Sequence, residues 1–290
     1  MKPVSTIKLP RLSVSSFGAV AVKDNIAVAH QDRSIMKLDV SSGTPQVSHL
    51  LHIMPHSIDS IHCLDDGTIV AVNQSMIMAF RMTATEFQLL WQIAAARGHA
   101  FIVSAKHEDK VRLIDSSRDG QTLVTAVSGK LTNPIPAPHC FGLISSGKEL
   151  YATERPSPRS ANLIHVDKSG QQTRVASNIE IVPIAVDSDK NIYYYDNNGD
   201  LSMRSKTADI PLPIQGVGWM VVQPNGKPCD YVAVARSGVY QVARGSTRRI
   251  SNQVVQGITV LKDYSVLRSG GELQTCKNQD LSPASVGLDI

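Results

Sequence analysis

Four histidines and a cysteine crowd one short region of the chain, and imidazole and thiolate groups are ligands that zinc takes. These residues are His49, His52, His56, His62 and Cys63. Successive side chains of a strand point to opposite faces, so His49 and His52, three residues apart, would not share a face. The spacing therefore favours scattered histidines, and we predict no bound metal.

Two loops approach known ligand-binding motifs without completing them. Residues 142–149 nearly match the phosphate loop GxxxxGK[ST], but Glu149 replaces the hydroxyl that would hold magnesium, and a strand is expected to follow. Residues 187–191 begin like a calcium loop, but Ile192 stands where glycine is needed and Asn198 where a bidentate glutamate is needed. Both segments are predicted to be turns between strands.

Nucleophilic catalysis has no local motif in this sequence. GxSxG is absent, and no helix is predicted that would carry such a turn. A Ser–His–Asp set could still assemble from distant segments, because geometry and not sequence order defines it. We predict a protein without catalytic residues, and an enzyme is the alternative.

Composition limits the classes of partner. The 290 residues are 42% hydrophobic and 19% charged, which is ordinary for a globular protein. The net charge of +4 is spread along the chain, and there are two Trp and five Phe. Nucleic-acid binders concentrate basic residues and stack bases on aromatic rings. No apolar run approaches the ~20 residues of a membrane helix. We predict neither a nucleic-acid nor a membrane partner.

The spacing of the cysteines and the N-terminal sequence together indicate the cellular compartment of the protein. Cys63, Cys140, Cys229 and Cys276 are far apart and form no CxxC pair. The N-terminus carries basic residues without a continuous apolar core, unlike a secretory signal. Such cysteines are expected to be reduced and buried. We predict a cytoplasmic protein, and delivery by a leaderless secretion system is the alternative.

A repeat of short strands and tight turns organises the chain. It is clearest at residues 181–204, where turn-forming residues at 187–191 and 197–199 separate three strands. Equivalent first turns lie near residues 25, 66, 98, 147, 190, 226 and 263. Their mean spacing of about 40 residues is the period of four-stranded propeller blades.

The strands are assigned unit by unit from this pattern. The third unit is assigned to strands at 89–95, 100–105 and 111–114. Fourth strands are predicted at 46–53, 122–127, 173–176 and 248–251. Residues 84–97 are predicted as strand, turn and strand, and a helix there is the alternative.

Residues 185–201, AVDSDKNIYYYDNNGDL, resemble the repeats of β-propeller proteins, in particular the NHL and WD40-like types. The Gly-His and Trp-Asp pairs of true WD40 blades are missing at the expected places. The resemblance implies a closed ring with a central channel. Seven units of about 40 residues account for the length, so we predict an all-β, single-domain seven-bladed propeller over residues 1–290, with six or eight blades as alternatives. A closed ring needs contacts that join its first and last blades, so residues 4–9 are predicted to supply the outer strand of the last blade.

The same resemblance offers a metal-dependent hydrolase as the alternative function. Propeller lactonases and esterases hold a divalent ion in the central channel with Glu, Asn and Asp side chains. Candidates at strand ends of this chain are Asp59, Asn73, Glu154, Asp187 and Asp196, and nothing in their spacing marks them as convergent.

The hairpins between second and third strands, together with the links between blades, are predicted to share one face, here called the hairpin face. Its loops are diverse and mix basic with acidic residues, which suits a protein partner. The residues predicted to contact that partner are Arg33, Arg155, Arg159, Asp196, Arg236 and Arg268. The predicted function is a protein–protein interaction scaffold of the effector or immunity type, monomeric on its own and without a cofactor.

Overall fold

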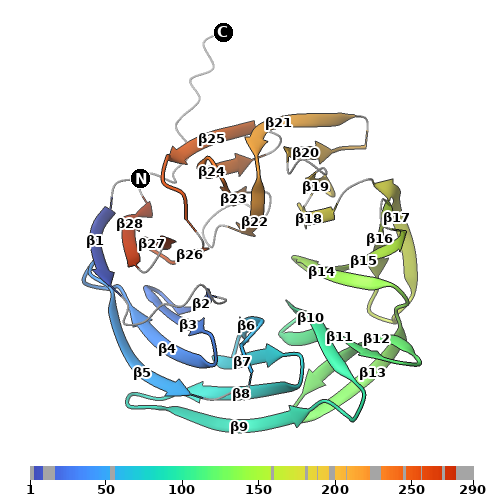
Figure 1. Ribbon diagram of the computed structural model, residues 1–290, viewed down its shortest axis with the longest axis horizontal. Helices are drawn as coiled ribbons and strands as arrows, with labels where there is room; N and C mark the ends of the chain where they lie inside the picture. Colours follow the sequence, from blue (N-terminus) through green and yellow to red (C-terminus); the bar gives the residue numbers. More distant parts are fainter. Residues whose placement is uncertain are drawn as a thin grey trace.

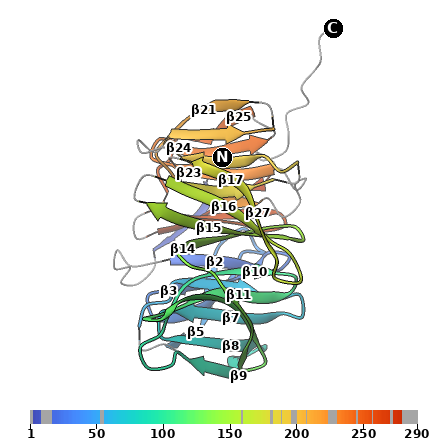
Figure 2. The ribbon, with the colours of Figure 1, turned by 90° about the vertical axis from the view of Figure 1, so that its right-hand side faces the viewer.

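The computed structural model describes residues 3–8, 17–52, 56–157, 160–179, 182–187, 189–195, 200–206, 208–222, 230–243, 246–255, 257–269 and 272–278. In these ranges the chain forms 28 strands, which pair as seven antiparallel sheets of four strands each. Figure 1 shows the sheets around a central opening, and Figure 2 shows that the molecule is shorter along the axis of this opening than across it. The prediction of an all-β propeller is confirmed.

Each sheet runs outward from an innermost strand beside the central opening (Figure 1). The innermost strands are β2 (Phe17–Lys23), β6 (Ser60–Cys63), β10 (Ala100–His107), β14 (Cys140–Ser146), β18 (Val182–Val186), β22 (Val217–Val222) and β26 (Gly257–Val260). The second strands are β3 (Ile26–Gln31), β7 (Thr68–Asn73), β11 (Lys110–Ser117), β15 (Glu149–Ser157), β19 (Ile192–Tyr195), β23 (Asp230–Ala235) and β27 (Tyr264–Ser269).

The outer half of each sheet holds the remaining strands. The third strands are β4 (Ser34–Asp39), β8 (Met76–Met82), β12 (Gly120–Val127), β16 (Ser160–Val166), β20 (Asp200–Arg204), β24 (Gly238–Ala243) and β28 (Glu272–Lys277). The outermost strands are β5 (Gln46–His52), β9 (Phe87–Ala94), β13 (Lys130–Pro136), β17 (Gln172–Ile179), β21 (Asp209–Gln215), β25 (Ser246–Ser251) and β1 (Pro3–Lys8).

The core lies between neighbouring sheets. Because each sheet is covered on both faces, its second strand is a nearly continuous apolar run and not an alternating one. The strand β7, with the sequence TIVAVN, is buried at every position. One apolar cluster joins Val28 and Ile35 of the first sheet to Ile69 and Phe80 of the second. Stacking against neighbours thus buries surface that a single sheet would expose.

The N-terminal strand belongs to the last sheet. β1 pairs antiparallel with β28, with Pro3 opposite Cys276 and Lys8 opposite Glu272. This is the outermost position that the sequence predicts for residues 4–9, of which Leu9 lies outside the described residues. The sheet that ends the chain therefore takes its fourth strand from the beginning of the chain.

The last sheet also packs against the first. The innermost strands β26 and β2 are in contact, and a buried cluster joins Ala27 and Leu38 to Val266 and Leu273. The Asn25 side-chain amide donates to Asp263 Oδ2 at 2.7 Å, and the Asp263 N–H donates to Asn25 Oδ1 at 2.9 Å. Apolar packing and hydrogen bonds thus hold residues near the two ends of the repeat array together.

We expect that replacing Thr275 by valine lowers the free energy of unfolding by about 1–3 kcal/mol, because a buried carbonyl loses its partner. Thr275 is fully buried, and its hydroxyl donates to the Gly43 carbonyl of the first sheet at 2.7 Å. Urea unfolding followed by circular dichroism measures the change. Thr85→Val, in an exposed turn, is the control and should shift stability by under about 0.5 kcal/mol. Equal stability of the two variants would contradict a role for this contact.

The third sheet begins later than the sequence predicts. Residues 89–95 fall mainly in β9, the outermost strand of the second sheet, and residues 122–127 lie in β12, a third strand. The helix alternative for residues 84–97 is wrong, because β9 is a strand. The sequence does not predict β13 or β21, since each contains two prolines. Proline lacks the N–H that a central strand needs, but an edge strand tolerates it.

Cys63, Cys140 and Cys276 are free and buried, as predicted, whereas Cys229 lies outside the described residues. A search of the described ranges for a helix with the length and apolarity of a membrane span finds none.

Candidate functional site

The hairpin face is built as the sequence predicts. Four backbone hydrogen bonds of 2.7–3.1 Å join this face. Two connect the segment that leads into a sheet with the preceding sheet's hairpin between second and third strands, and two connect the end of a second strand with the link that precedes the same sheet. The bonds run from Ile58 to Asp32, from Phe101 to Gln74, from Arg155 to His139 and from Arg236 to Gly216. These bonds place the hairpins and the interblade links together on one face of the ring.

The predicted contact residues differ in their surroundings. Arg33 and Arg155 are exposed, and the Arg155 guanidinium lies 4.5 Å from the centre of the Phe141 ring. Arg159 and Asp196 lie outside the described residues. Arg33 belongs to the first sheet and Arg155 to the fourth, so lying on the same face of the ring does not bring them close together.

Arg268 is not a surface residue. Only 4% of it is exposed, and burial lowers the pKa of its guanidinium. It lies near His30, whose pKa is lowered to about 4 by burial and by the Arg268 charge. The sequence predicts exposure for Arg268 because it stands beside a hairpin, but the residue is buried in the structure, near His30 of the first sheet.

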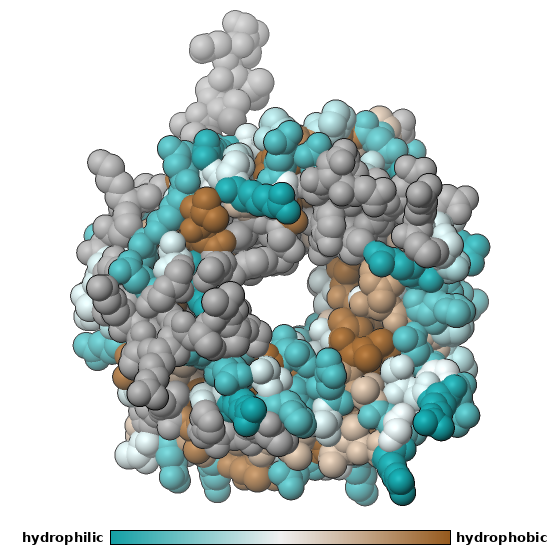
Figure 3. Space-filling view, viewed as in Figure 1, coloured by the Kyte–Doolittle hydropathy of each residue, from teal (hydrophilic) through white to brown (hydrophobic). Residues whose placement is uncertain are grey.

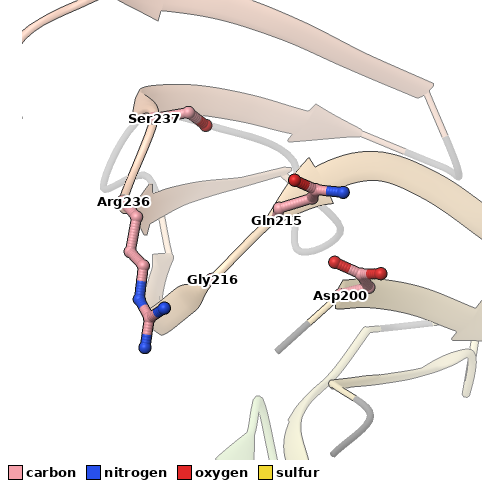
Figure 4. Close-up of a pocket in the computed structure, with 5 residues that line it drawn as sticks. All are labelled: Asp200, Gln215, Gly216, Arg236 and Ser237. Carbon is pink, nitrogen blue, oxygen red and sulfur yellow. The ribbon is translucent and has the colours of Figure 1, made fainter. Parts of the chain in front are cut away.

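Arg236 lines a hollow of about 520 Å³ on the hairpin face, together with Asp200, Gln215, Gly216 and Ser237. Figure 4 shows Asp200 on one side of this hollow and Arg236 on the other, with Gln215 between them. Asp200 begins β20 of the fifth sheet, whereas Arg236 and Ser237 form the turn between β23 and β24 of the sixth. The hollow therefore spans two neighbouring sheets and is walled mainly by polar groups.

Gly216 allows the Arg236 side chain to lie close to the interblade link. A Cβ atom on Gly216 would come within 2.7 Å of Arg236 Cγ and Cδ, and its φ of +63° is one that favours glycine. The Arg236 N–H also donates to the Gly216 carbonyl at 3.1 Å. The link and the arginine stem are therefore packed against each other, and the Arg236 side chain runs past Gly216 (Figure 4).

A second hollow of about 460 Å³ shares Asp200, Gln215 and Ser237 with the first. It continues along β21, where Pro211 and Pro213 are exposed. We call the two hollows together the Arg236 groove. One end of this groove is polar and the other presents rigid apolar proline rings.

A hydrogen-bonded cluster of two serines and a histidine joins the innermost strands of the second and third sheets. Ser60 Oγ lies 2.6 Å from Ser104 Oγ, and Ser104 Oγ lies 2.8 Å from His62 Nε2. Ser60 and His62 belong to β6 and Ser104 belongs to β10, and the two strands adjoin at the central opening (Figure 1). All three side chains are half-buried. We call them the Ser60–His62–Ser104 cluster.

The electrostatic surroundings keep His62 neutral near pH 7. Burial, with smaller contributions from the charges of Lys106 and His30, lowers its pKa to about 4. Lys106 itself is held by Asp65, at 2.6 Å between Nζ and Oδ1. A neutral imidazole offers one nitrogen as an acceptor, which here can be Nε2 facing Ser104.

Three of the five residues considered for a channel metal make local hydrogen bonds, whereas Asp59 is exposed and Asp196 lies outside the described residues. Asn73 Oδ1 accepts N–H groups of Ser75 and Met76, and Asp187 Oδ1 accepts those of Asp189 and Asn191. Glu154 accepts from the Asn162 amide. Within the described ranges no group of three or more His, Cys, Asp or Glu side chains is arranged to hold a metal ion.

The two partial motifs are turns between strands. Residues 142–149 span the hairpin from β14 to β15, and Asp187 caps the turn from β18 to β19. Lys190 takes a left-handed backbone conformation in that turn, with φ of +64°. Both interpretations from the sequence are confirmed.

Neither the Ser60–His62–Ser104 cluster nor the Arg236 groove could be assembled from sequence spacing alone. His62 stands out in the sequence only among possible zinc ligands, and Ser104 carries no signal, because it is 42 residues away in a different sheet. Arg236 is predicted from its place in a hairpin, whereas Gln215 and Gly216 come from a link beside it. The sequence pattern predicts which segments are hairpins and which are links, but it does not predict which of them lie next to each other in the structure.

The sheets and their arrangement define a β-propeller repeat protein. No protein-family model matches the chain, and no curated protein matches it in sequence. Solved structures are similar in fold. A virginiamycin B lyase from Staphylococcus aureus, a catalytically inactive histidine-to-alanine variant with quinupristin, has a TM-score of 0.67 at 10% identity, over 93% of this chain and 97% of that chain.

Two further structures are similar in fold. The WD40 β-propeller domain of Doa1 has a TM-score of 0.63 at 12% identity, over 93% of this chain and 96% of that chain. The computationally designed Ika8 protein has a TM-score of 0.65 at 12% identity, over 96% of this chain and all of the other. At these identities the comparisons establish the fold, which serves both enzymes and other classes of protein.

Proposed function

We propose that the chain closes as a seven-bladed ring and acts as a scaffold that binds a protein partner on its hairpin face. The ring closure is supported by the pairing of β1 with β28 and by the apolar packing of the last sheet on the first. The binding role is supported above all by the Arg236 groove, which collects polar groups from two sheets on the predicted face.

The groove favours a partner segment that carries a carboxylate beside an apolar side chain. Arg236 would take the carboxylate, because guanidinium groups form paired hydrogen bonds with it. Pro211 and Pro213 would contact the apolar side chain, and their rings lose little conformational freedom on binding. Asp200, on the opposite wall, would disfavour a segment with a second carboxylate there.

We expect Arg236→Ala to weaken partner binding by about tenfold to a hundredfold, since arginine is frequent among the residues that dominate interface energies. The partner is first isolated by affinity capture on the wild-type protein, and the dissociation constants of the variants are then measured by calorimetry.

The matched control for this measurement is Arg81→Ala. Arg81 is also exposed, but it lies near the end of β8 away from the hairpin that follows Asn73. We expect its affinity to equal that of the wild-type protein. Equal affinities for wild type and Arg236→Ala would show that the partner does not use the groove.

A further inference from the structure

We propose that Ser104 and His62 form a nucleophile and general-base pair in the central channel, which cleaves carboxylic esters carrying an apolar group. This activity would be separate from partner binding, because the cluster lies on innermost strands and the Arg236 groove lies on the hairpin face.

The packing of β6 directs its polar side chains toward the third sheet. Ile61 and Cys63 belong to the apolar cluster that the second sheet shares with the first. Alternate residues of a strand point to opposite faces, so Ser60 and His62 point the other way. They meet Ser104 there, at the contact between β6 and β10. The core therefore holds the base and the nucleophile in register from separate sheets.

One consistent assignment of protons satisfies the cluster. With His62 neutral, Nε2 accepts the Ser104 hydroxyl proton across the 2.8 Å contact. Ser104 has then used its own proton, so the Ser60 hydroxyl donates to Ser104 Oγ across 2.6 Å. Such a donor stabilises the negative charge that grows on Ser104 Oγ as the proton leaves. The pair has the hydrogen-bond distance expected of an activated serine.

The chemical step follows from this arrangement. Ser104 Oγ attacks the ester carbonyl carbon, its proton passes to His62 Nε2, and the bond from carbon to the alcohol oxygen breaks. The proton then moves from His62 to the departing alkoxide, which leaves as the alcohol. Water next attacks the acyl-serine with His62 again taking a proton, which releases the carboxylic acid and restores the Ser104 hydroxyl.

The channel offers access and an apolar wall. Figure 3 shows the opening in the ring, with hydrophobic surface along the side where β14 lies in Figure 1. Phe141, Leu143 and Ile144 of β14 are half-buried, and Ile102 of β10 is exposed. Each innermost strand forms one edge of its sheet, and backbone N–H groups at such an edge can stabilise a developing oxyanion. An ester with an apolar acyl or alcohol group matches these features.

The direct test is covalent labelling with an alkyl fluorophosphonate. In this reaction Ser104 Oγ bonds to phosphorus, fluoride leaves, and the hydroxyl proton passes to His62. We expect one adduct per chain by intact mass and its location on Ser104 by peptide mapping. Ser104→Ala should abolish it, and His62→Gln should slow it by about a hundredfold or more, the usual loss when a general base is removed.

The pH profile separates this pair from an ordinary exposed serine and histidine. Labelling should persist below pH 6 and decline only near pH 4, because His62 stays neutral down to its lowered pKa. The charged groups that act on His62 are Lys106 and, when protonated, His30, and Asp65 holds Lys106. A decline centred near pH 6.5 would instead assign the base to an unperturbed histidine.

Two controls keep the proposal falsifiable. Ser145→Ala removes a half-buried serine from the innermost strand β14 and should label like the wild-type protein. Ser104→Cys provides a second variant of similar volume if Ser104→Ala does not fold, and it should lose the phosphonate adduct. No adduct on the folded wild-type protein, or an adduct on another serine, would overturn the proposal.

Discussion

Replacing Phe80 by alanine is expected to lower the free energy of unfolding by about 3–5 kcal/mol, the usual cost of removing a buried phenyl ring. Phe80 is 1% exposed and packs in the cluster between the first and second sheets. The loss has two parts, the transfer of the ring from the core and the cavity left between two sheets that cannot close fully. Thermal unfolding should show a melting temperature lower by about 5–15 °C.

The strand partner of Phe80 supplies a matched control. Leu89 lies directly opposite it on β9, and 47% of Leu89 is exposed. Leu89→Ala should therefore change stability by under about 1 kcal/mol, because little of its surface leaves water on folding. Similar losses for the two variants would contradict a structure in which the neighbouring sheet covers Phe80 and leaves Leu89, on the outermost strand, exposed.

Gly238→Ala is expected to be the most damaging substitution on the hairpin face. Gly238 has φ of +137°, and a Cβ atom there would lie 2.1 Å from the Ser251 carbonyl oxygen. That oxygen belongs to the backbone of β25, which cannot move without disturbing the ladder with β24. We expect a loss of about 3 kcal/mol or more, from backbone strain and from the clash together.

Gly120 provides the comparison, because it occupies the equivalent place in the third sheet. Each glycine begins a third strand after a two-residue turn, and Gly120 has φ of +134°. Nothing lies within 4 Å of a Cβ atom on Gly120. Gly120→Ala should therefore lower the free energy of unfolding only through backbone strain, by about 1–2 kcal/mol. Urea unfolding of both variants separates backbone strain from the steric clash. Equal losses of unfolding free energy would show that the contact with Ser251 contributes nothing.

The sequence predicts which residues lie in or beside the hairpins, but not which of these residues are exposed. Arg236 is correctly placed in a turn, because turn residues mark where strands end, whereas Arg155 lies within β15, which continues to Ser157. Arg268 stands beside a turn in the same way, yet it is buried. The difference arises because burial depends on what a neighbouring sheet covers, and the turn signal carries no information about that neighbour.

By itself the sequence determined the class of fold. Local signals were sufficient for this, because apolar runs of strand length, punctuated by Asn, Asp and Gly turns, recur about every 40 residues. The same signals placed the N-terminal strand outside the first unit. They failed at β13 and β21, where prolines obscure strands that need no outer hydrogen-bond partner.

Only the tertiary structure decided which side chains meet. Ser104 and His62 are distant in sequence and come together because the second and third sheets pack side by side at the opening. The Arg236 groove likewise needs two sheets and the link between them. Side-chain chemistry at such places depends on contacts between blades, whereas the sequence repeat reports mainly the hydrogen-bonded pattern within each blade.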